Sequence, residues 1–378
     1  DEGDPFNKIL HNKSLNKLRS KNLFSKVKSK IIDTENSDQK DIDIIIEEKP
    51  TGEIMAGAGY GSDGSTFSVG IRENNFKGEG INLNTKLSLT EQTVKGFFEY
   101  THPNFAYSDR ALSTSLESSV TDKLTDFGYK SSLNKVSLGT RYEQFENTFF
   151  SPRLSISSES LDTTSTASAA YKKQEGSYFD TTFDYGLTLD KRNSAYQPSS
   201  GFYSSWFQQL PIISENQTIV NGYTITGYKE IADDMILSSG IYSRAINSLT
   251  NDDVRVSKRI FAPSSRLRGF ESGRVGPVDG ADHIGGNYVV TFNTSSTVPY
   301  ILQTQENMDL KVFFDAGNIW GVDYSNALDD SNTIRTSTGV ALEWITPVGP
   351  LSFSYSEVLS KASTDKTESF KFQLGTTF

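Results

Sequence analysis

The chain has 378 residues, 35% of them hydrophobic and 12% aromatic, and its formal net charge is −10. The low apolar fraction argues against a thick apolar core, and the negative charge argues against a nucleic-acid-binding protein. The absence of Cys excludes a disulfide scaffold and thiolate chemistry. No apolar run reaches the length of about 18 residues that a membrane helix needs, whereas the strands of a membrane β-barrel need only about 9–11 residues each.

Residues 1–49 differ in pattern from the rest and predict one helix and two strands. The helix is expected to begin at Asp4-Pro5, with Pro in its first turn, and to close at Leu23-Phe24. Strands are expected over 27–32 and 41–46. Because a helix and two strands make a poor domain alone, we expect the first part of this domain to lie upstream of Asp1.

Alternation of apolar and polar residues begins after Pro50 and continues nearly to the end of the chain. A period of two places successive side chains on opposite faces of a sheet. The pattern gives sixteen candidate strands, near residues 53–60, 65–75, 79–90, 93–102, 109–120, 127–143, 147–159, 177–190, 201–211, 217–231, 235–248, 285–299, 308–319, 334–346, 350–358 and 368–378.

A soluble β-sandwich with one wet face is the alternative to a membrane barrel. Several candidate strands, such as 127–143 and 217–231, are much longer than the usual strand of about 5–6 residues, and there are too many for two packed sheets. An even count fits a bacterial barrel, and lipid tolerates no open sheet edge. We therefore predict an all-β transmembrane barrel of sixteen antiparallel strands over residues 50–378.

One connection, at about 249–284, is longer than the others and contains Arg268-Gly269-Phe270 together with several Gly and a Pro. Long loops without secondary structure are usually functional or disordered. The Arg and Phe residues and the Gly-rich joints favour a folded loop, which we expect to insert into the barrel lumen.

Five motifs follow one another along the chain: Glu48-Lys49-Pro50-Thr51-Gly52 leading into Gly57-Ala58-Gly59-Tyr60-Gly61, Asn75-Phe76-Lys77-Gly78-Glu79-Gly80, Arg268-Gly269-Phe270, Phe313-Phe314-Asp315-Ala316-Gly317-Asn318-Ile319-Trp320, and Pro347-Val348-Gly349-Pro350 before a last strand ending in Phe378. Each motif is weak alone, but in this order they resemble the BamA-like outer-membrane assembly factors, in which POTRA domains precede a barrel of the bacterial surface antigen superfamily. The resemblance covers the whole chain, because the stretch from Glu2-Gly3-Asp4 through Leu23-Phe24 resembles the second half of a POTRA domain.

The resemblance implies a protein that folds other β-barrels and inserts them into the outer membrane through a lateral seam between its first and last strands. It implies that 1–49 is the C-terminal part of a periplasmic POTRA domain, that the work needs no cofactor or metal, and that no nucleic acid is bound. The implied partners are unfolded outer-membrane β-barrel proteins, outer-membrane lipid and accessory lipoproteins on the POTRA domains.

Arg268 is the first candidate site residue. An Arg inside a barrel needs a carboxylate partner, because an unpaired charge removed from water is costly. Alternation places Phe313 and Asp315 on one face of their strand, and Asp315 would be very unfavourable against lipid, so we expect it in the lumen, paired with Arg268. A solvated loop Arg is the alternative. The family often has a Glu on the strand after the loop, where simple alignment gives Ser295, so this network is expected to be thinner here.

The seam is the second candidate site. The first strand is expected to be short, and its Gly57, Gly59 and Gly61 weaken it or allow twist; Gly375 is a plausible kink in the last strand. Weak pairing exposes backbone groups to which an incoming strand can pair. Alternatively, the glycines only relieve crowding. The remaining seam residues are the alternating apolar side chains of the last strand, Phe370, Phe372, Leu374 and Phe378.

Catalysis is not expected. His11, His102 and His283 are far apart in the sequence, and no nucleophile motif, phosphate loop or zinc spacing occurs. The alternatives to an assembly factor are a secretion transporter of the same superfamily, of the two-partner or the translocation-and-assembly type, then a passive porin, and last a soluble β-protein.

Overall fold

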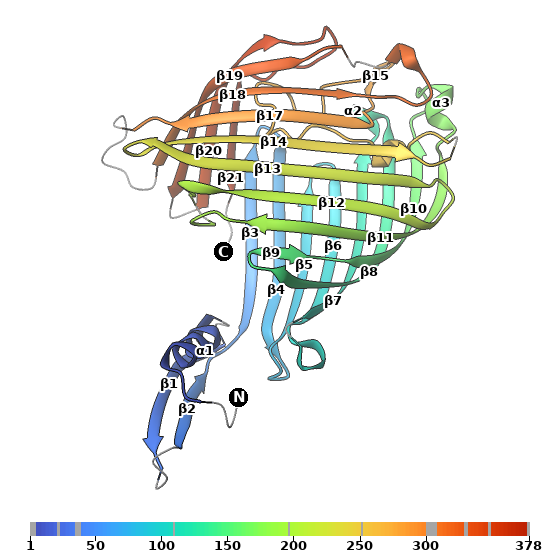
Figure 1. Cartoon of the computed structure of the whole chain (residues 1–378). Coiled ribbons are helices and arrows are strands. Elements are labelled where there is room, and N and C mark those ends of the chain that lie inside the picture. Colours follow the sequence, from blue (N-terminus) through green and yellow to red (C-terminus); the bar gives the residue numbers. More distant parts are fainter. Residues whose placement is uncertain are drawn as a thin grey trace.

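The structure is a computed structural model that describes residues 5–20, 23–34, 39–108, 110–195, 197–250, 252–299, 308–328, 332–346 and 349–375. It has a small N-terminal part and a large barrel, joined where the chain enters the first barrel strand (Figure 1). Among these residues, no helix combines the length and the apolar character that crossing a bilayer would require.

The N-terminal part is the helix α1 (Lys8–Ser20) beside an antiparallel pair of strands, β1 (Phe24–Asp33) and β2 (Lys40–Glu48). Leu15, Leu23 and Val27 are its buried apolar residues. The expectation that Leu23-Phe24 closes the helix is wrong. Phe24 instead begins β1, where it pairs with Glu48, so cross-strand pairing decides its conformation.

The barrel is a closed antiparallel sheet with sixteen strand positions, as the sequence predicts, because the last strand pairs with the first. One position is shared by the short β9 and by β10, which both lie between β8 and β11 and are separated by Ser151-Pro152. The strands are β3 (Gly52–Gly61), β4 (Gly64–Phe76), β5 (Ile81–Thr90), β6 (Thr93–His102), β7 (Ala111–Lys123), β8 (Tyr129–Phe145), β9 (Thr148–Phe150), β10 (Arg153–Thr163), β11 (Gly176–Asp190), β12 (Ser200–Ser214), β13 (Thr218–Ala232), β14 (Met235–Ser248), β17 (Tyr288–Thr297), β18 (Met308–Trp320), β19 (Arg335–Thr346), β20 (Gly349–Ser360) and β21 (Phe370–Gly375).

Side chains alternate between an apolar exterior and a polar interior. Leu116, Val136 and Ile156 are exposed in one row across neighbouring strands. The adjacent positions Ser137 and Ser155 are buried on the other face, with their hydroxyl oxygens 3.1 Å apart. A sheet of this kind buries little apolar surface within the protein, which explains the low hydrophobic fraction of the sequence.

Because the strands alternate in direction, the connections gather at two ends of the barrel. We call the end that carries α1, β1 and β2 the near end and the opposite end the far end (Figure 1). The far end holds α2 (Leu124–Phe127), α3 (Ala169–Lys172) and η3 (Asn326–Leu328), whereas η1 (Phe105–Tyr107) lies at the near end.

The longest far-end connection joins β14 to β17 through residues 249–287, and we call it the inward loop. It contains η2 (Val256–Lys258) and a hairpin of β15 (Val278–Asp279) and β16 (Asp282–His283). It ends three residues later than expected from the sequence, because β17 begins only at Tyr288.

Candidate functional site

The inward loop is folded against the inner wall of the barrel and carries its own apolar residues into the interior. The buried apolar residues of the loop in the largest cluster are Val254, Ile260, Leu267, Phe270 and Val275. They pack against residues of β13, β14, β17 and β18, namely Val220, Ile246, Val289 and Ile319. The loop therefore fills part of the lumen as an ordered element.

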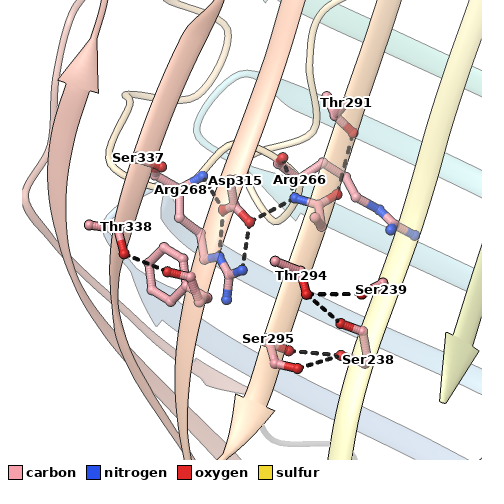
Figure 2. A network of polar contacts seen from close by, with 12 residues as sticks. Ser238, Ser239, Arg266, Arg268, Thr291, Thr294, Ser295, Asp315, Ser337 and Thr338 are labelled. Atoms are coloured by element: carbon pink, nitrogen blue, oxygen red, sulfur yellow. Dashed lines mark hydrogen bonds and ion pairs between the residues drawn. The ribbon is translucent and has the colours of Figure 1, made fainter. Parts of the chain in front are cut away.

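Arg268 projects from the inward loop onto Asp315 of β18 (Figure 2). Its Nε donates to Asp315 Oδ2 over 2.7 Å, and its Nη2 donates to Oδ1 over 2.7 Å, which is a bidentate ion pair. The backbone N–H of Arg268 also donates to Oδ2, over 3.1 Å. The two side chains that the sequence analysis pairs are thus in direct contact.

The surroundings of this pair explain why both charges are tolerated. Asp315 is fully buried, so its carboxylate depends on protein donors. The Arg268 guanidinium lies 3.5 Å from the ring centroid of Phe313, which favours the cation through the face of the ring. Ser337 of β19 donates its hydroxyl to the Arg268 carbonyl over 2.5 Å, so the loop backbone is fixed as well as the side chain.

Asn293 of β17 completes this network and is a residue that the sequence analysis missed. It lies directly across from Asp315 in the ladder. Its Nδ2 donates to Asp315 Oδ1 over 2.8 Å and to the Arg266 carbonyl over 2.6 Å. Ser295, which the simple alignment placed at the family's Glu position, instead lies 2.8 Å from the hydroxyl of Ser238. Only the β17–β18 register identifies the residue opposite Asp315.

Gly269 and Phe270 fit the wall tightly. Gly269 has φ +89°, a conformation that L side chains rarely adopt, and a Cβ there would lie 3.1 Å from the side chains of Ser356 and Val358. Phe270 is buried in the apolar cluster described above. Its backbone forms an antiparallel bridge with Thr367 of the loop before β21.

Two further Arg residues fasten the inward loop at other places. Arg255 donates from Nη1 to Glu159 Oε2 over 3.1 Å and from Nη2 to Asp180, on β10 and β11. Arg274 donates from Nη2 to Asp126 Oδ1 over 2.5 Å, at α2. The sequence analysis singled out neither pair, because the partners come from strands and loops far away in the chain.

The strands β21 and β3 close the barrel, and we call them the closing pair. Along the described residues, their ladder joins three Cα partners, whereas β13 and β14 are paired at fourteen positions. The three partners are Gln373 with Gly61, Leu374 with Tyr60, and Gly375 with Gly59. Phe378 lies outside the described residues, and Phe370 is exposed ahead of this ladder.

The far end of the closing pair is tied by side chains as well as by backbone. Phe372 accepts a hydrogen bond from the Ser62 backbone N–H over 3.1 Å, and its ring lies 5.7 Å from that of Tyr60. Lys371 Nζ lies 2.6 Å from Asp63, which belongs to the turn after β3. This ion pair therefore spans the closing pair.

The glycines of β3 permit a close approach of the β21 backbone. A Cβ at Gly61 would lie 2.5 Å from the Phe372 carbonyl oxygen, and one at Gly59 would lie 3.1 Å from that of Leu374. Gly57 pairs with β4 on the other side of the strand. The first strand is not unusually short: β3 has 10 residues, the same length as β5 and β6, and six residues of β21 are described.

Comparison with known protein families decides what kind of barrel this is. The model of the Omp85 superfamily domain matches residues 75–378. The chain belongs to the Omp85 superfamily. Outer membrane protein assembly factor BamA from Nitratidesulfovibrio vulgaris is 23% identical over 391 residues, covering 100% of this chain and 48% of that protein. The BamA of Neisseria meningitidis serogroup B is 22% identical and covers 90% of this chain and 49% of the relative.

This Omp85 chain thus spans about half the length of the curated relatives that it matches. A eukaryotic relative, the sorting assembly machinery 50 kDa subunit of Saccharomyces cerevisiae, is 24% identical over 217 residues, covering 54% of the chain and 44% of that protein.

Solved structures show the same barrel. BamA from Haemophilus ducreyi lacking POTRA domains 1–3 superposes with a TM-score of 0.88 at 25% identity, covering 97% of this chain and 78% of that one. CdiB from Acinetobacter baumannii has a TM-score of 0.62 at 11% identity over 96% of this chain and 67% of the other, a likeness of fold alone.

Across the described residues of this Omp85 barrel, no group of three or more His, Asp or Glu side chains is arranged to hold a metal ion. His283 is buried at the inward loop, and its Nε2 lies 3.3 Å from the Thr364 carbonyl oxygen. Burial lowers the pKa of His283 below its usual value, because removal from water disfavours the imidazolium form.

Proposed function

We propose that this Omp85 chain folds β-barrel proteins and inserts them into the bacterial outer membrane without covalent chemistry. Support comes from the relatives named outer membrane protein assembly factor BamA and from the sorting assembly machinery subunit of yeast. The barrel supplies two elements suited to this work: a sheet that is closed by its first and last strands, and a lumen partly filled by an anchored loop.

The observation that carries the proposal is the closing pair. Within the described part of the chain, its ladder joins three Cα partners, against fourteen between β13 and β14. Along the described residues, Glu53, Ile54 and Met55 pair with β4 but have no partner on β21. A strand edge with free N–H and C=O groups is a template to which an extended segment can add. An unfolded barrel protein could therefore pair with β3 when β21 moves aside.

The inward loop gives this opening a fixed frame. We assign Arg268, Gly269, Phe270 and Asp315 to an anchor that holds the loop inside the lumen while the closing pair separates. The bidentate pair, the buried phenylalanine ring and the crowded glycine support that assignment. A barrel whose loop is fastened to β18 can lose contact between its end strands without losing the rest of its interior.

The N-terminal part fits delivery of the substrate. We assign residues 1–49 to the C-terminal part of a POTRA domain in the periplasm, and 50–378 to the outer-membrane barrel. The helix and two strands, and the 97% coverage against a BamA lacking POTRA domains 1–3, support this assignment. The partners are then unfolded outer-membrane β-barrel proteins, membrane lipid and accessory lipoproteins.

The test is the folding rate of a small unfolded outer-membrane barrel added to lipid vesicles that contain the full chain. A Tyr60→Cys/Leu374→Cys variant serves as its own control, because its disulfide locks the closing pair and reduction frees it, and the chain has no Cys of its own. We expect acceleration by the wild type and the reduced variant, and its loss in the oxidised variant. Equal acceleration by the locked and the free variant would contradict the opening of this pair.

The rival functions give other outcomes. The likeness to CdiB is one of fold, so a secretion transporter of the same superfamily is the second candidate. It would accelerate no barrel folding and would pass a dedicated partner through its pore. A passive porin would show a wide, steady conductance that the disulfide leaves unchanged.

A further inference from the structure

The connection from β20 to β21, residues 361–369, lies against the inward loop, and we call it the β21 leader. The Glu368 N–H donates to the Gly269 carbonyl over 3.0 Å, and the Glu271 N–H donates to the Lys366 carbonyl over 3.1 Å. The Lys366 N–H donates to the Arg274 carbonyl over 3.0 Å. The β21 leader is therefore joined by backbone hydrogen bonds to the residues that directly follow Arg268.

The carboxylate of Asp365 holds the β21 leader in place. Its carboxylate receives Arg335 Nε at Oδ2 over 2.9 Å and Arg335 Nη2 at Oδ1 over 3.0 Å. The Ala362 N–H donates to Oδ2 over 2.6 Å, and the Gly276 N–H donates to Oδ1 over 3.3 Å. One carboxylate thus joins β19, the inward loop and its own leader.

The burial of this group makes the contact strong. Both side chains of the Arg335–Asp365 pair have no exposed surface. Asp365 is the one buried residue of the β21 leader, whose other side chains are exposed or half-buried. Removing one partner from a buried ion pair leaves an uncompensated charge, so the position of the leader depends on this carboxylate more than on any of its other side chains.

The place of the leader in the chain gives Asp365 its significance. It lies five residues before Phe370, where β21 begins, and β21 is the strand that closes the barrel. In its described residues, β21 pairs with five residues of β20 and three of β3. The leader enters this strand directly at Phe370, so the group that fixes the leader also fixes where the strand begins.

We propose that Asp365 is a positioning residue that sets where β21 meets β3, and so how readily the closing pair separates. This deepens the function proposed above and rests on it. Asp365 acts through the β21 leader and touches neither β3 nor a substrate. The Arg268 anchor and the closing pair are thereby coupled through a defined path of hydrogen bonds from Asp315 to Arg268, Gly269 and the leader.

The experiment measures the closing pair directly, in vesicles and without substrate. In the Tyr60→Cys/Leu374→Cys chain, the yield of the disulfide under a mild oxidant reports how often the two strands are in register. Asp365→Asn is expected to lower this yield about tenfold relative to the parent, the change in an equilibrium that about 1.4 kcal/mol produces. Glu159→Gln is the matched control, because it cuts a buried ion pair of the same inward loop at the opposite wall.

A second variant guards against a folding defect. Asp365→Asn leaves Arg335 charged and buried, whereas Arg335→Gln/Asp365→Asn removes both charges and keeps the polar shape. Retarded migration of the unheated barrel in gels shows that each variant is folded. An unchanged yield in either folded variant, or an equal loss in Glu159→Gln, would overturn the proposal. Failure of both variants to fold would overturn it too, because a positioning residue leaves the barrel intact.

The readout separates this inference from the proposed function. If Asp365→Asn lowers the disulfide yield but the wild-type chain accelerates no barrel folding, the positioning role stands and the assembly function fails. If the wild type accelerates folding and the yield does not respond, the assembly function stands and the positioning role fails.

Discussion

The wall formed by β11 to β14 and the closing pair of β21 and β3 are parts of one sheet with very different pairing. The wall strands have 14 or 15 residues each, and β13 and β14 pair at fourteen positions. The closing pair joins the 10 residues of β3 to the six described residues of β21 through three described partners. Since each ladder position adds backbone hydrogen bonds, the described part of the closing pair contributes fewer of them than the wall does.

Buried ion pairs of the interior lie on one side of the closing pair. Arg268, Arg335 and their carboxylate partners hold the inward loop and the β21 leader to β18 and β19. No comparable buried ion pair, within the described part of the chain, reaches β3. The contrast teaches that buried ion pairs attach the β21 side of the closing pair to the interior, whereas the β3 side is held to the inward loop by the more exposed hydrogen bond from Ser264 to Asp63.

The largest effect is expected from Arg268→Ala, which removes the partner of the buried Asp315. We expect a loss of about 3–5 kcal/mol in the free energy of unfolding, because the carboxylate remains buried and uncompensated. Urea unfolding of the barrel in vesicles measures it. Arg192→Ala, which cuts a partly exposed pair with Asp190, is the control and should cost at most about 1 kcal/mol. Equal losses in Arg268→Ala and Arg192→Ala would contradict the stronger contribution of the buried ion pair.

A second prediction compares glycines in the two regions. Gly61→Ala should push β21 away, because the added Cβ would lie 2.5 Å from the Phe372 carbonyl oxygen. Overpacking of this kind costs about 1–3 kcal/mol. Gly227→Ala in β13 meets open space and should be nearly silent. Amide hydrogen exchange should accelerate in β3 and β21 of the first variant only, and equal exchange in both would contradict the close approach.

A smaller effect is expected from Lys371→Gln, which cuts the ion pair with Asp63 across the closing pair. Because Asp63 is partly exposed, the free energy that holds β21 against β3 should fall by about 0.2–1 kcal/mol, and this loss should shrink at high salt. The disulfide yield of the Tyr60→Cys/Leu374→Cys chain, measured with and without Lys371→Gln at low and high salt, tests this. A yield that is insensitive to both the substitution and salt would show that this pair does not hold the seam.

The smallest effect concerns pH. Burial lowers the pKa of His283 in the folded state. As the pH falls below about 6.5, the ordinary pKa of histidine, this side chain is therefore protonated in the unfolded state before it is protonated in the folded state. Stability is therefore lost between that pH and the lower folded pKa. Arg274 and Lys366 also lower this pKa, whereas Asp365 and the Thr364 carbonyl raise it. His283→Gln should flatten the pH dependence of unfolding in this window, and an unchanged profile would contradict it.

Much of the barrel follows from the sequence by itself. Alternation places all sixteen strand positions, because the period of two is a local property of each segment. It also places Asp315 on the inner face, since lipid excludes a carboxylate from the outer one. Residue type therefore determined the fold class, the inward direction of Asp315 and its need for a cation.

The tertiary structure alone decided which residues surround that pair and what holds the seam. Asn293 rather than Ser295 lies across from Asp315, because register depends on how β17 and β18 pair. The partners of Arg255, Arg274 and Arg335 come from distant segments that closure of the barrel brings together. Closure also set the close approach that requires glycine at 61, since a ladder between the first and last strands joins residues that are very far apart in the chain.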